Sequence, residues 1–446
     1  MPSVMQANEE RTAIVGVELT RSARSQNASD VFPVSAEESL EELAVLAESA
    51  GGMVVERLLQ QRPALDPATL IGSGKVDEIK ARVEADLIDT VIFDRELTPT
   101  QLRNLERRLG CKILDRTQLI LDIFARRART REGQLQVELA QLNYLLPRLT
   151  GRGTQMSRLG GGIGTRGPGE TQLETDRRRI GKRIAKLKEE IERVRATRSV
   201  QRSQRRAVPL STVSLVGYTN AGKSTLFNRL TGADVMADAR MFATLDPTVR
   251  QIRLPSGRRV LISDTVGFIR NLPTTLVDAF RATLEEVTAA VLLLHVVDIT
   301  SSEAADHTAH VMKVLAEIGA QGTRQILVLN KSDRLQDQSV DHDPQTLTHR
   351  LLGETARQNA TEAVVISAHT GQGIEQLLSH IDDAIGLDPV SRQRFRLPLG
   401  EGRALNLLYE RAAVISAEYH DDNCEILADT PESIRNRLAE FNVSPE

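Results

Sequence analysis

The stretch Ser214–Thr225, SLVGYTNAGKST, decides how the middle of this chain folds. An apolar run ends in Gly217-x-x-x-x-Gly222-Lys223-Ser224 and leads into a helical pattern, which is the strand–loop–helix context of a phosphate-binding loop. The glycines let successive backbone N–H groups curl around a β-phosphate, and Lys223 can reach the β- and γ-phosphate oxygens. A hydroxyl at Ser224 can ligate Mg2+. The stretch therefore predicts a nucleotide-binding α/β domain.

Two further motifs follow this loop, each at the end of an apolar run that indicates a strand. ISDTVG places Asp264 and Gly267 where a carboxylate can hold Mg2+ through water and a glycine N–H can contact the γ-phosphate. LVLNKSD places Asn330, Lys331 and Asp333 at the end of a later strand. The Asp333 carboxylate can accept hydrogen bonds from the N1–H and the exocyclic amine of guanine, a donor pair that adenine lacks. The base is therefore predicted to be guanine.

A fourth motif, VISAHTG, places Ser367 and Ala368 after the last strand, where a backbone N–H can contact the guanine O6. In the same site, Lys331 is expected to lie along the base and Asn330 to tie its loop to the phosphate-binding loop. Four motifs in this order, each in a strand context, predict a guanine-nucleotide-binding domain.

The segment MFATLDPTVR, residues 241–250, is expected to supply a threonine that completes Mg2+ coordination, and Thr244 and Thr248 both qualify. Phe268 directly follows Gly267, where Ras-like enzymes carry a glutamine that orients the attacking water. Because phenylalanine can neither orient nor deprotonate water, catalysis must come from positioning by Mg2+, Lys223 and backbone groups. We expect hydrolysis to be slow until a partner orders these segments.

The 446 residues allow about three domains at ~150 residues each. Alternating strand and helix patterns predict an N-terminal α/β domain over residues 1–125 and the nucleotide-binding domain over 208–388. Residues 126–207 are expected to form a basic helical hairpin, and residues 389–446 a small α+β domain. Two distant cysteines and the lack of a signal-peptide pattern favour the cytoplasm, and no apolar run is long enough to span a membrane.

The predicted hairpin rests on two narrow apolar seams. Leu135, Leu139, Leu142, Leu146 and Leu149 alternate four- and three-residue spacings, and the same spacing recurs from Ile180 to Val194. Two antiparallel helices joined by residues 150–169 fit this pattern best. Two helices packed on different domains are the alternative.

The same region carries the charge of the chain. Residues 126–206 hold 21 lysines and arginines against 8 acidic residues, although the whole chain has a net charge of -3. A surface of this kind binds nucleic-acid phosphates, and few aromatic residues favour recognition of a folded RNA by charge and shape. A solvated helix flank is the alternative. The RNA-contact candidates are Arg152, Arg158, Arg166, Arg177, Arg178, Arg179, Lys182 and Arg183.

The stretch GGIGTRG, residues 161–167, contains the letter pattern of a dinucleotide-binding loop. Such a loop needs a strand before it, which is absent here, so NAD or FAD is not expected. A Gly/Arg-rich loop at the tip of the hairpin could let its backbone approach RNA closely. A flexible linker is the alternative.

The nucleotide-binding domain carries the motifs GYTNAGKST, FATLDPT, DTVGF and NKSD, and the rest of the chain carries GSGKVDEI, LTPTQLRNLE and GGGIGTRGPGETQLETDRR. In these motifs the chain resembles the HflX family of GTPases, of the Obg/TrmE-type class. The resemblance covers nearly the whole chain and is weakest after residue 390. In that family the threonine of FAT is the Mg2+ ligand, so the resemblance favours Thr244 over Thr248. It also leaves open an ATP site in the N-terminal region, near Gly72–Lys75, where a helix-start turn is the simpler interpretation.

The expected catalytic residues are Lys223, Thr244 and Gly267, with Ser224 and Thr244 as the Mg2+ ligands. Asn220 has two open interpretations: K+ recruitment as a second cofactor, as in related GTPases, or a simple turn preference. The expected GTP-binding residues are Gly217, Tyr218, Thr219, Asn220, Ala221, Gly222, Lys223, Ser224, Thr225, Phe242, Ala243, Thr244, Leu245, Asp246, Asp264, Thr265, Val266, Gly267, Asn330, Lys331, Ser332, Asp333, Ser367, Ala368 and His369.

The resemblance implies a Mg2+-dependent GTPase that binds GTP and GDP and docks on the large ribosomal subunit and its rRNA. Ribosome splitting or rescue, translation and ribosome biogenesis are the implied roles. DNA is not an expected partner, and a monomer is expected away from the ribosome. The alternative is a signalling-type GTPase switch that recruits protein partners without binding ribosomes.

Overall fold

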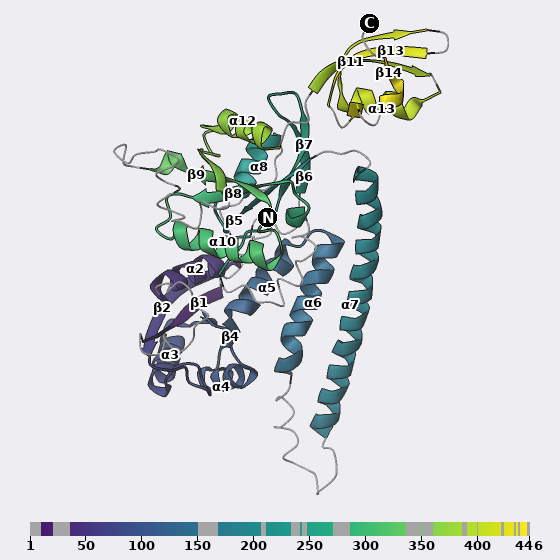
Figure 1. Ribbon diagram of the computed structural model, residues 1–446. Coiled ribbons are helices and arrows are strands. Elements are labelled where there is room, and N and C mark those ends of the chain that lie inside the picture. Colours follow the sequence, from purple (N-terminus) through teal and green to yellow (C-terminus); the bar gives the residue numbers. More distant parts are fainter. Residues whose placement is uncertain are drawn as a thin grey trace, which may run out of the picture.

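A computed structural model of the chain describes residues 10–20, 36–149, 168–206, 211–232, 241–242, 248–270, 286–335, 348, 360–385, 390–398, 400–420, 423–431, 434–435 and 438–443. Figure 1 shows an N-terminal α/β unit, two long helices, a second α/β unit and a small C-terminal unit. The predicted fold class is confirmed. Within the described residues, no helix combines the length and apolar character needed to cross a bilayer.

The N-terminal unit is a parallel sheet in the order β2-β1-β3-β4, with helices on both faces. Helices α3 and α4 pack on one face, and α2 and α5 pack on the face that is turned toward the second α/β unit (Figure 1). The elements are β1 (Glu10–Leu19), α2 (Ala36–Ser49), β2 (Gly52–Arg62), α3 (Ser73–Asp86), β3 (Thr90–Phe93), α4 (Pro99–Leu109), β4 (Lys112–Asp115) and α5 (Arg116–Arg127).

The basic region forms two long helices, α6 (Arg131–Arg148) and α7 (Pro168–Arg206). Arg131 pairs with Glu190 at 2.9 Å, and Arg183 pairs with Glu138 at 2.7 Å. Because the partner numbers fall as the α6 numbers rise, the helices run antiparallel, and the predicted seam packs around Leu135, Leu187 and Ile191. The residues 150–167 that join the helices lie outside the described part of the chain.

The second α/β unit is a six-stranded sheet in the order β10-β9-β8-β5-β7-β6, in which only β6 runs antiparallel to its neighbour. The carboxyl ends of β5, β7, β8 and β9 therefore meet at one edge, where ligands bind in open α/β sheets. Its elements are β5 (Thr212–Gly217), α8 (Lys223–Thr231), β6 (Thr248–Arg253), β7 (Arg259–Asp264), β8 (Leu292–Asp298), α10 (Ala304–Glu317), β9 (Arg324–Asn330), the 3-10 helix η3 (Ser332–Arg334), β10 (Ala360–Val365) and α12 (Ile374–Ala384).

The C-terminal unit is an antiparallel sheet in the order β12-β13-β11-β14, with a helix packed against it. Its elements are β11 (Val390–Pro398), α13 (Gly402–Arg411), β12 (Ala413–Tyr419), β13 (Asn423–Pro431), the 3-10 helix η5 (Ala439–Phe441) and β14 (Asn442–Val443). Its buried apolar side chains form a core of their own.

The two α/β units share one continuous apolar core, although the sequence treats them as separate domains. The apolar faces of α2 and α5 pack on the phosphate-loop end of the second sheet, and apolar residues of α6 belong to the same cluster. The rings of Phe124 and Phe242 meet edge to face with centroids 4.6 Å apart, and the Met241 N–H donates to the Ser49 hydroxyl at 3.0 Å. The N-terminal unit is therefore placed beside the predicted nucleotide site.

Candidate GTP-binding site

The loop between β5 and α8 has the backbone shape of a phosphate cradle. Gly217, Asn220 and Gly222 have φ angles of 148°, 61° and 95°. A side chain on Gly217 would collide with the Val296 carbonyl, and one on Gly222 would collide with the Asn330 amide. Helix α8 begins at Lys223, so its N-terminal N–H groups face the space that the loop surrounds.

Lys223 lies inside this cradle with its side chain buried. Its Nζ donates to the carbonyl oxygens of Gly217 at 3.0 Å and Tyr218 at 2.7 Å. Burial lowers the pKa of the Lys223 ammonium to about 8. The negative charge of a bound triphosphate would stabilise this buried ammonium group. The position of Lys223 therefore fits its predicted role on the β- and γ-phosphates.

Two side chains of the predicted Mg2+ site are in contact. The Ser224 hydroxyl donates to Asp264 Oδ2 at 2.8 Å, and Asp264 is fully buried at the end of β7. A hydroxyl beside a carboxylate fits Mg2+, which takes one or two protein ligands and completes its shell with phosphates and water. Thr244, the other predicted ligand, lies outside the described residues together with Ala243, Leu245 and Asp246. The alternative, Thr248, opens β6 and pairs with Asp264 in the sheet.

The predicted base-binding loops are joined by Asn330. Its amide nitrogen donates to the Ala221 carbonyl at 2.8 Å, and its amide oxygen accepts from the Ala368 N–H at 2.9 Å. Asp333 accepts a hydrogen bond from the Ser367 hydroxyl at 2.6 Å, which lowers the pKa of its carboxyl group. These contacts assemble the expected pair of motifs at one edge of the sheet and leave Asp333 ionised for a guanine.

Lys331 makes a contact that the motif does not predict. Its Nζ pairs with Asp298 at the end of β8, at 2.6 Å. Its backbone is left-handed, with a φ angle of 70°. Asp298 therefore holds the ammonium end of the side chain that we expect along the base.

The segment after Asp264 is bound to the phosphate loop through its backbone. Thr219 N–H donates to the Phe268 carbonyl at 2.8 Å, and Phe268 N–H donates to the Gly217 carbonyl at 3.1 Å. A side chain on Gly267 would lie 3.0 Å from Lys223 Nζ. The Phe268 ring is buried in the shared core. The Phe268 side chain is therefore part of the core, while the backbone of Phe268 is hydrogen-bonded to the phosphate loop.

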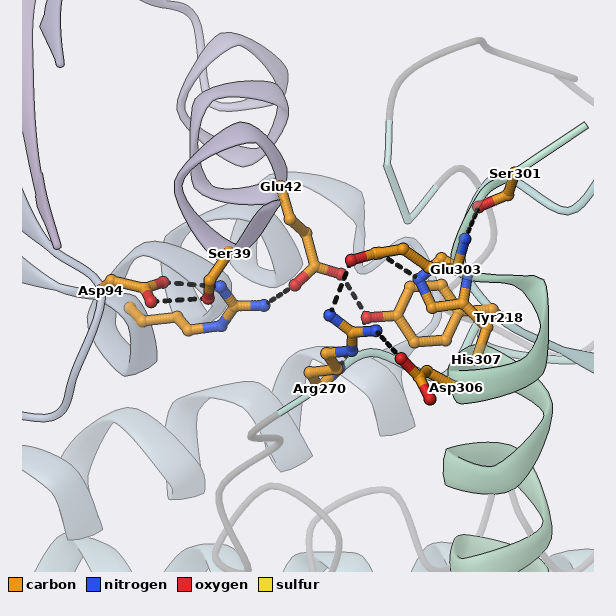
Figure 2. Close-up of polar contacts among 10 residues, drawn as sticks. Ser39, Glu42, Asp94, Tyr218, Arg270, Ser301, Glu303, Asp306 and His307 are labelled. Carbon is orange, nitrogen blue, oxygen red and sulfur yellow. Dashed lines mark hydrogen bonds and ion pairs between the residues drawn. The ribbon is translucent and has the colours of Figure 1, made fainter. Parts of the chain in front are cut away.

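The sequence predicts Tyr218 as a GTP-binding residue of the loop and does not predict the surroundings of its side chain. Its ring stacks on the His307 imidazole with centroids 3.7 Å apart, and its hydroxyl reaches Glu42 on α2 of the N-terminal unit (Figure 2). The motif gives no signal for this contact, because the tyrosine stands at a variable position of the loop pattern. A cavity of about 420 Å³ lies alongside, lined by α2, the phosphate loop and the start of α10.

Charged groups are crowded into this junction between the units. Arg270 pairs with Glu303 at 3.2 Å and lies 3.9 Å from Asp306, while His307 lies 3.0 Å from Glu303 (Figure 2). Burial, followed by a hydrogen bond with Glu38 of α2, raises the pKa of Glu303 to about 7. Burial also lowers the pKa of His307 to about 4, so its imidazole is neutral at neutral pH.

The RNA-contact candidates on α7 differ in their surroundings. Arg177, Arg178, Arg179 and Lys182 are exposed. Arg183 instead makes two hydrogen bonds of 2.7 Å to Glu138 and helps hold the hairpin together. Arg152, Arg158 and Arg166 lie outside the described residues.

Comparisons with known proteins agree on one family. Family models described as "GTP-binding GTPase N-terminal", "GTP-binding GTPase Middle Region" and "50S ribosome-binding GTPase" match residues 37–125, 127–205 and 212–331. The GTPase HflX of Caldanaerobacter subterraneus is 47% identical over 408 residues, which cover 92% of this chain and 91% of that protein. The GTPase HflX of Escherichia coli is 45% identical, covering 84% of this chain and 86% of that protein.

Among solved structures, the chain is similar to a GTP-binding protein from the archaeon Sulfolobus solfataricus in complex with GDP. The two are 26% identical and the TM-score is 0.45. The similarity covers 84% of this chain and 98% of that one.

The first prediction concerns the base. Asp333→Asn should lower GTP affinity at least ~100-fold, because two hydrogen bonds to a charged acceptor are lost. The same variant should bind xanthosine triphosphate better than GTP, since the xanthine base offers an acceptor where guanine has a donor. Fluorescence titration with GTP and with xanthosine triphosphate measures this change in base preference. Unchanged GTP affinity would show that Asp333 does not contact the base.

The second prediction concerns pH. The pKa of Glu303 rises on folding from a usual value of 4.5 to about 7, so the folded state holds its proton more tightly. This contribution to stability is complete below pH 4.5 and is lost as the pH rises through 7. Glu303→Gln keeps a neutral side chain, so its melting temperature should gain on the native protein by a few degrees between pH 5 and 8.

Glu84→Gln is the matched control, since it removes one exposed carboxylate from α3. Melting curves across the pH range should show a constant offset for this control. A constant offset for Glu303→Gln as well would contradict the assigned proton.

Proposed function

The chain belongs to the HflX family of GTPases, and we propose that it docks on the large ribosomal subunit through its N-terminal and helical region. There its nucleotide state would control ribosome splitting or rescue, translation or ribosome biogenesis. It binds GTP and GDP and hydrolyses GTP. We further propose that it acts in the cytoplasm, as a monomer away from the ribosome.

The observation that carries the proposal is the exposed positive face of α7. Arg177, Arg178, Arg179 and Lys182 are all exposed, and among their acidic neighbours Glu174 lies 3.7 Å from Arg178. Helix α7 is 39 residues long and projects beside the two α/β units (Figure 1). A long basic rod of this kind fits the phosphate surface of folded rRNA. The family model described as "50S ribosome-binding GTPase" supports the same partner.

At the nucleotide, each predicted site residue would act on one part of the ligand. Lys223 would bind the β- and γ-phosphate oxygens, and the Gly267 N–H would contact the γ-phosphate. Ser224, Thr244 and, through water, Asp264 would hold Mg2+, which neutralises charge developing on the phosphates when bound. Asn330, Lys331 and Asp333 would select and orient guanine.

The proposed hydrolysis is slow without a partner. The Phe268 ring lies in the shared core and has no group that could orient water. The rate then depends on how well backbone groups and Lys223 are positioned. Contact with the ribosome would order the segments on either side of the phosphates and raise the rate.

The ribosome proposal predicts nucleotide-dependent co-sedimentation. In sucrose gradients, the protein with a non-hydrolysable GTP analogue should move with purified large subunits more strongly than the protein with GDP. Replacing Arg177, Arg178 and Arg179 together by Gln should weaken binding and lower the slope of log affinity against log salt by about 3. The matched control replaces Arg250, Arg253 and Arg259, three exposed arginines of β6 and β7.

Two outcomes would count against this proposal. Absence of any nucleotide-dependent shift favours a signalling-type switch that recruits proteins instead. Equal losses in the α7 variant and the control would mean that net charge, rather than the α7 face, causes the binding.

The cofactor prediction concerns Asn220. Its left-handed backbone, with a φ angle of 61°, suits a turn as well as a K+ ligand. Asn220→Gly tolerates the same backbone and removes only the side chain. If Asn220 recruits K+, hydrolysis should be faster in K+ than in Na+ for the native protein, and the variant should lose this difference while still binding GDP. A variant that retains the difference would leave the turn as the only role.

A further inference from the structure

Tyr218 belongs to the phosphate loop, yet its side chain points away from the phosphates and into the junction between the α/β units. The residue is 5% exposed. Its ring lies nearly parallel to the neutral imidazole of His307, with an angle of 13° between the planes. Burial, followed by the Glu42 carboxylate, raises the pKa of the phenol well above its usual value, so the hydroxyl keeps its proton.

The hydroxyl connects three separate parts of the chain. It donates to Glu42 of α2, and its oxygen accepts from the backbone N–H of Arg270 at 3.0 Å (Figure 2). The backbone at Tyr218 also forms a bridge with Phe268. The phosphate loop therefore holds the segment Gly267–Arg270 at two points, by the backbone of Gly217 and Thr219 at Phe268 and by the phenol of Tyr218 at Arg270.

This segment contains the backbone on which hydrolysis depends. Gly267 packs against Lys223 so closely that a side chain would come within 3.0 Å of Lys223 Nζ. A displacement of the segment by a fraction of an ångström would move the Gly267 N–H relative to the γ-phosphate. Because Phe268 offers no catalytic group, the rate should be sensitive to such a displacement.

The N-terminal unit holds the other side of the phenol. Glu42 pairs with Arg116, which is 2% exposed and also pairs with Asp94 at 2.9 Å. Burial acts to lower the pKa of Arg116, but the two carboxylates outweigh it and raise that pKa. Truncating one member of such a buried network is costly, so Glu42 has little freedom to move.

On the other flank, Arg270 is anchored to α10. Its guanidinium pairs with Glu303 at 3.2 Å and lies 3.9 Å from Asp306. His310 holds the neighbouring residue, with Nε2 2.9 Å from the Ile269 carbonyl oxygen. Tyr218 thus lies between one carboxylate fixed by the N-terminal unit and one segment fixed by α10.

We propose that Tyr218 is a positioning residue for GTP hydrolysis. Its phenol, oriented by Glu42 of the N-terminal unit, holds the Gly267–Arg270 backbone where the Gly267 N–H can act on the γ-phosphate. The N-terminal unit thereby contributes to the rate of hydrolysis through one hydroxyl group. The proposal rests on the GTPase activity alone and is independent of ribosome binding.

The test is intrinsic hydrolysis by the full-length protein without ribosomes. Tyr218→Phe removes the hydroxyl and keeps the ring on His307. We expect kcat to fall on the order of 10-fold, as for the loss of one hydrogen bond in the transition state. KM for GTP and Kd for GDP should remain within about 2-fold, because the phosphate loop itself is unchanged.

Tyr144→Phe is the matched control. Tyr144 is also 5% exposed and carries a buried phenol, but it lies on α6, where the Arg148 guanidinium stacks on its ring at 3.5 Å from the centroid. This control should change kcat by less than about 2-fold. Melting temperatures of both variants report whether either loss is merely structural.

A second variant tests the pair. Glu42→Gln should also lower kcat, and the double variant Tyr218→Phe/Glu42→Gln should lose less than the product of the two single effects, since both act through one contact. An unchanged or raised kcat in Tyr218→Phe would overturn the proposal. Equal falls in Tyr218→Phe and Tyr144→Phe, or fully multiplicative losses in the double variant, would also overturn it.

Discussion

The burial of one apolar face determines how this molecule is arranged. Helices α2 and α5 cover one side of the N-terminal sheet, and their outer surfaces pack on the phosphate-loop end of the second sheet, with Phe124 against Phe242. Burial of this kind is favourable in proportion to the apolar area that leaves water. The N-terminal unit is consequently fixed beside the segments that we propose contact the γ-phosphate, and it is part of the surroundings of the candidate site.

Within that apolar junction lies a small set of charges that packing alone would not favour. Arg116 is buried and carries its charge because Glu42 and Asp94 surround it. Buried ion pairs add little net stability, but they require a defined geometry. Here the geometry orients Glu42 toward Tyr218, and through it the backbone after Gly267. The polar network therefore adds specificity to an interface whose stability comes from its apolar side chains.

Much of the candidate site could be predicted, because its chemistry requires particular residues at particular spacings. Lys223, Ser224 and Asp264 meet at one edge of the sheet, and Asn330 joins the phosphate loop to Ala368. The apolar seam also predicted the antiparallel pair of basic helices. The role of Arg183 could not be predicted in this way, because the sequence shows only a cation in a basic run. The structure shows that this cation makes a bidentate pair with Glu138. A charge count does not say which charges are already paired.

The sequence by itself determined the motifs, the alternation of strands and helices in the two α/β units, and the guanine nucleotide, because these depend on local patterns and on short spacings. Only the tertiary structure decided what surrounds Tyr218 and Phe268. Tyr218 meets Glu42, which is 176 residues away along the chain, and no pattern of neighbouring residues records such a contact. Those positions depend on how two separately recognisable units bury their apolar faces against each other, and that packing exists only in the folded molecule.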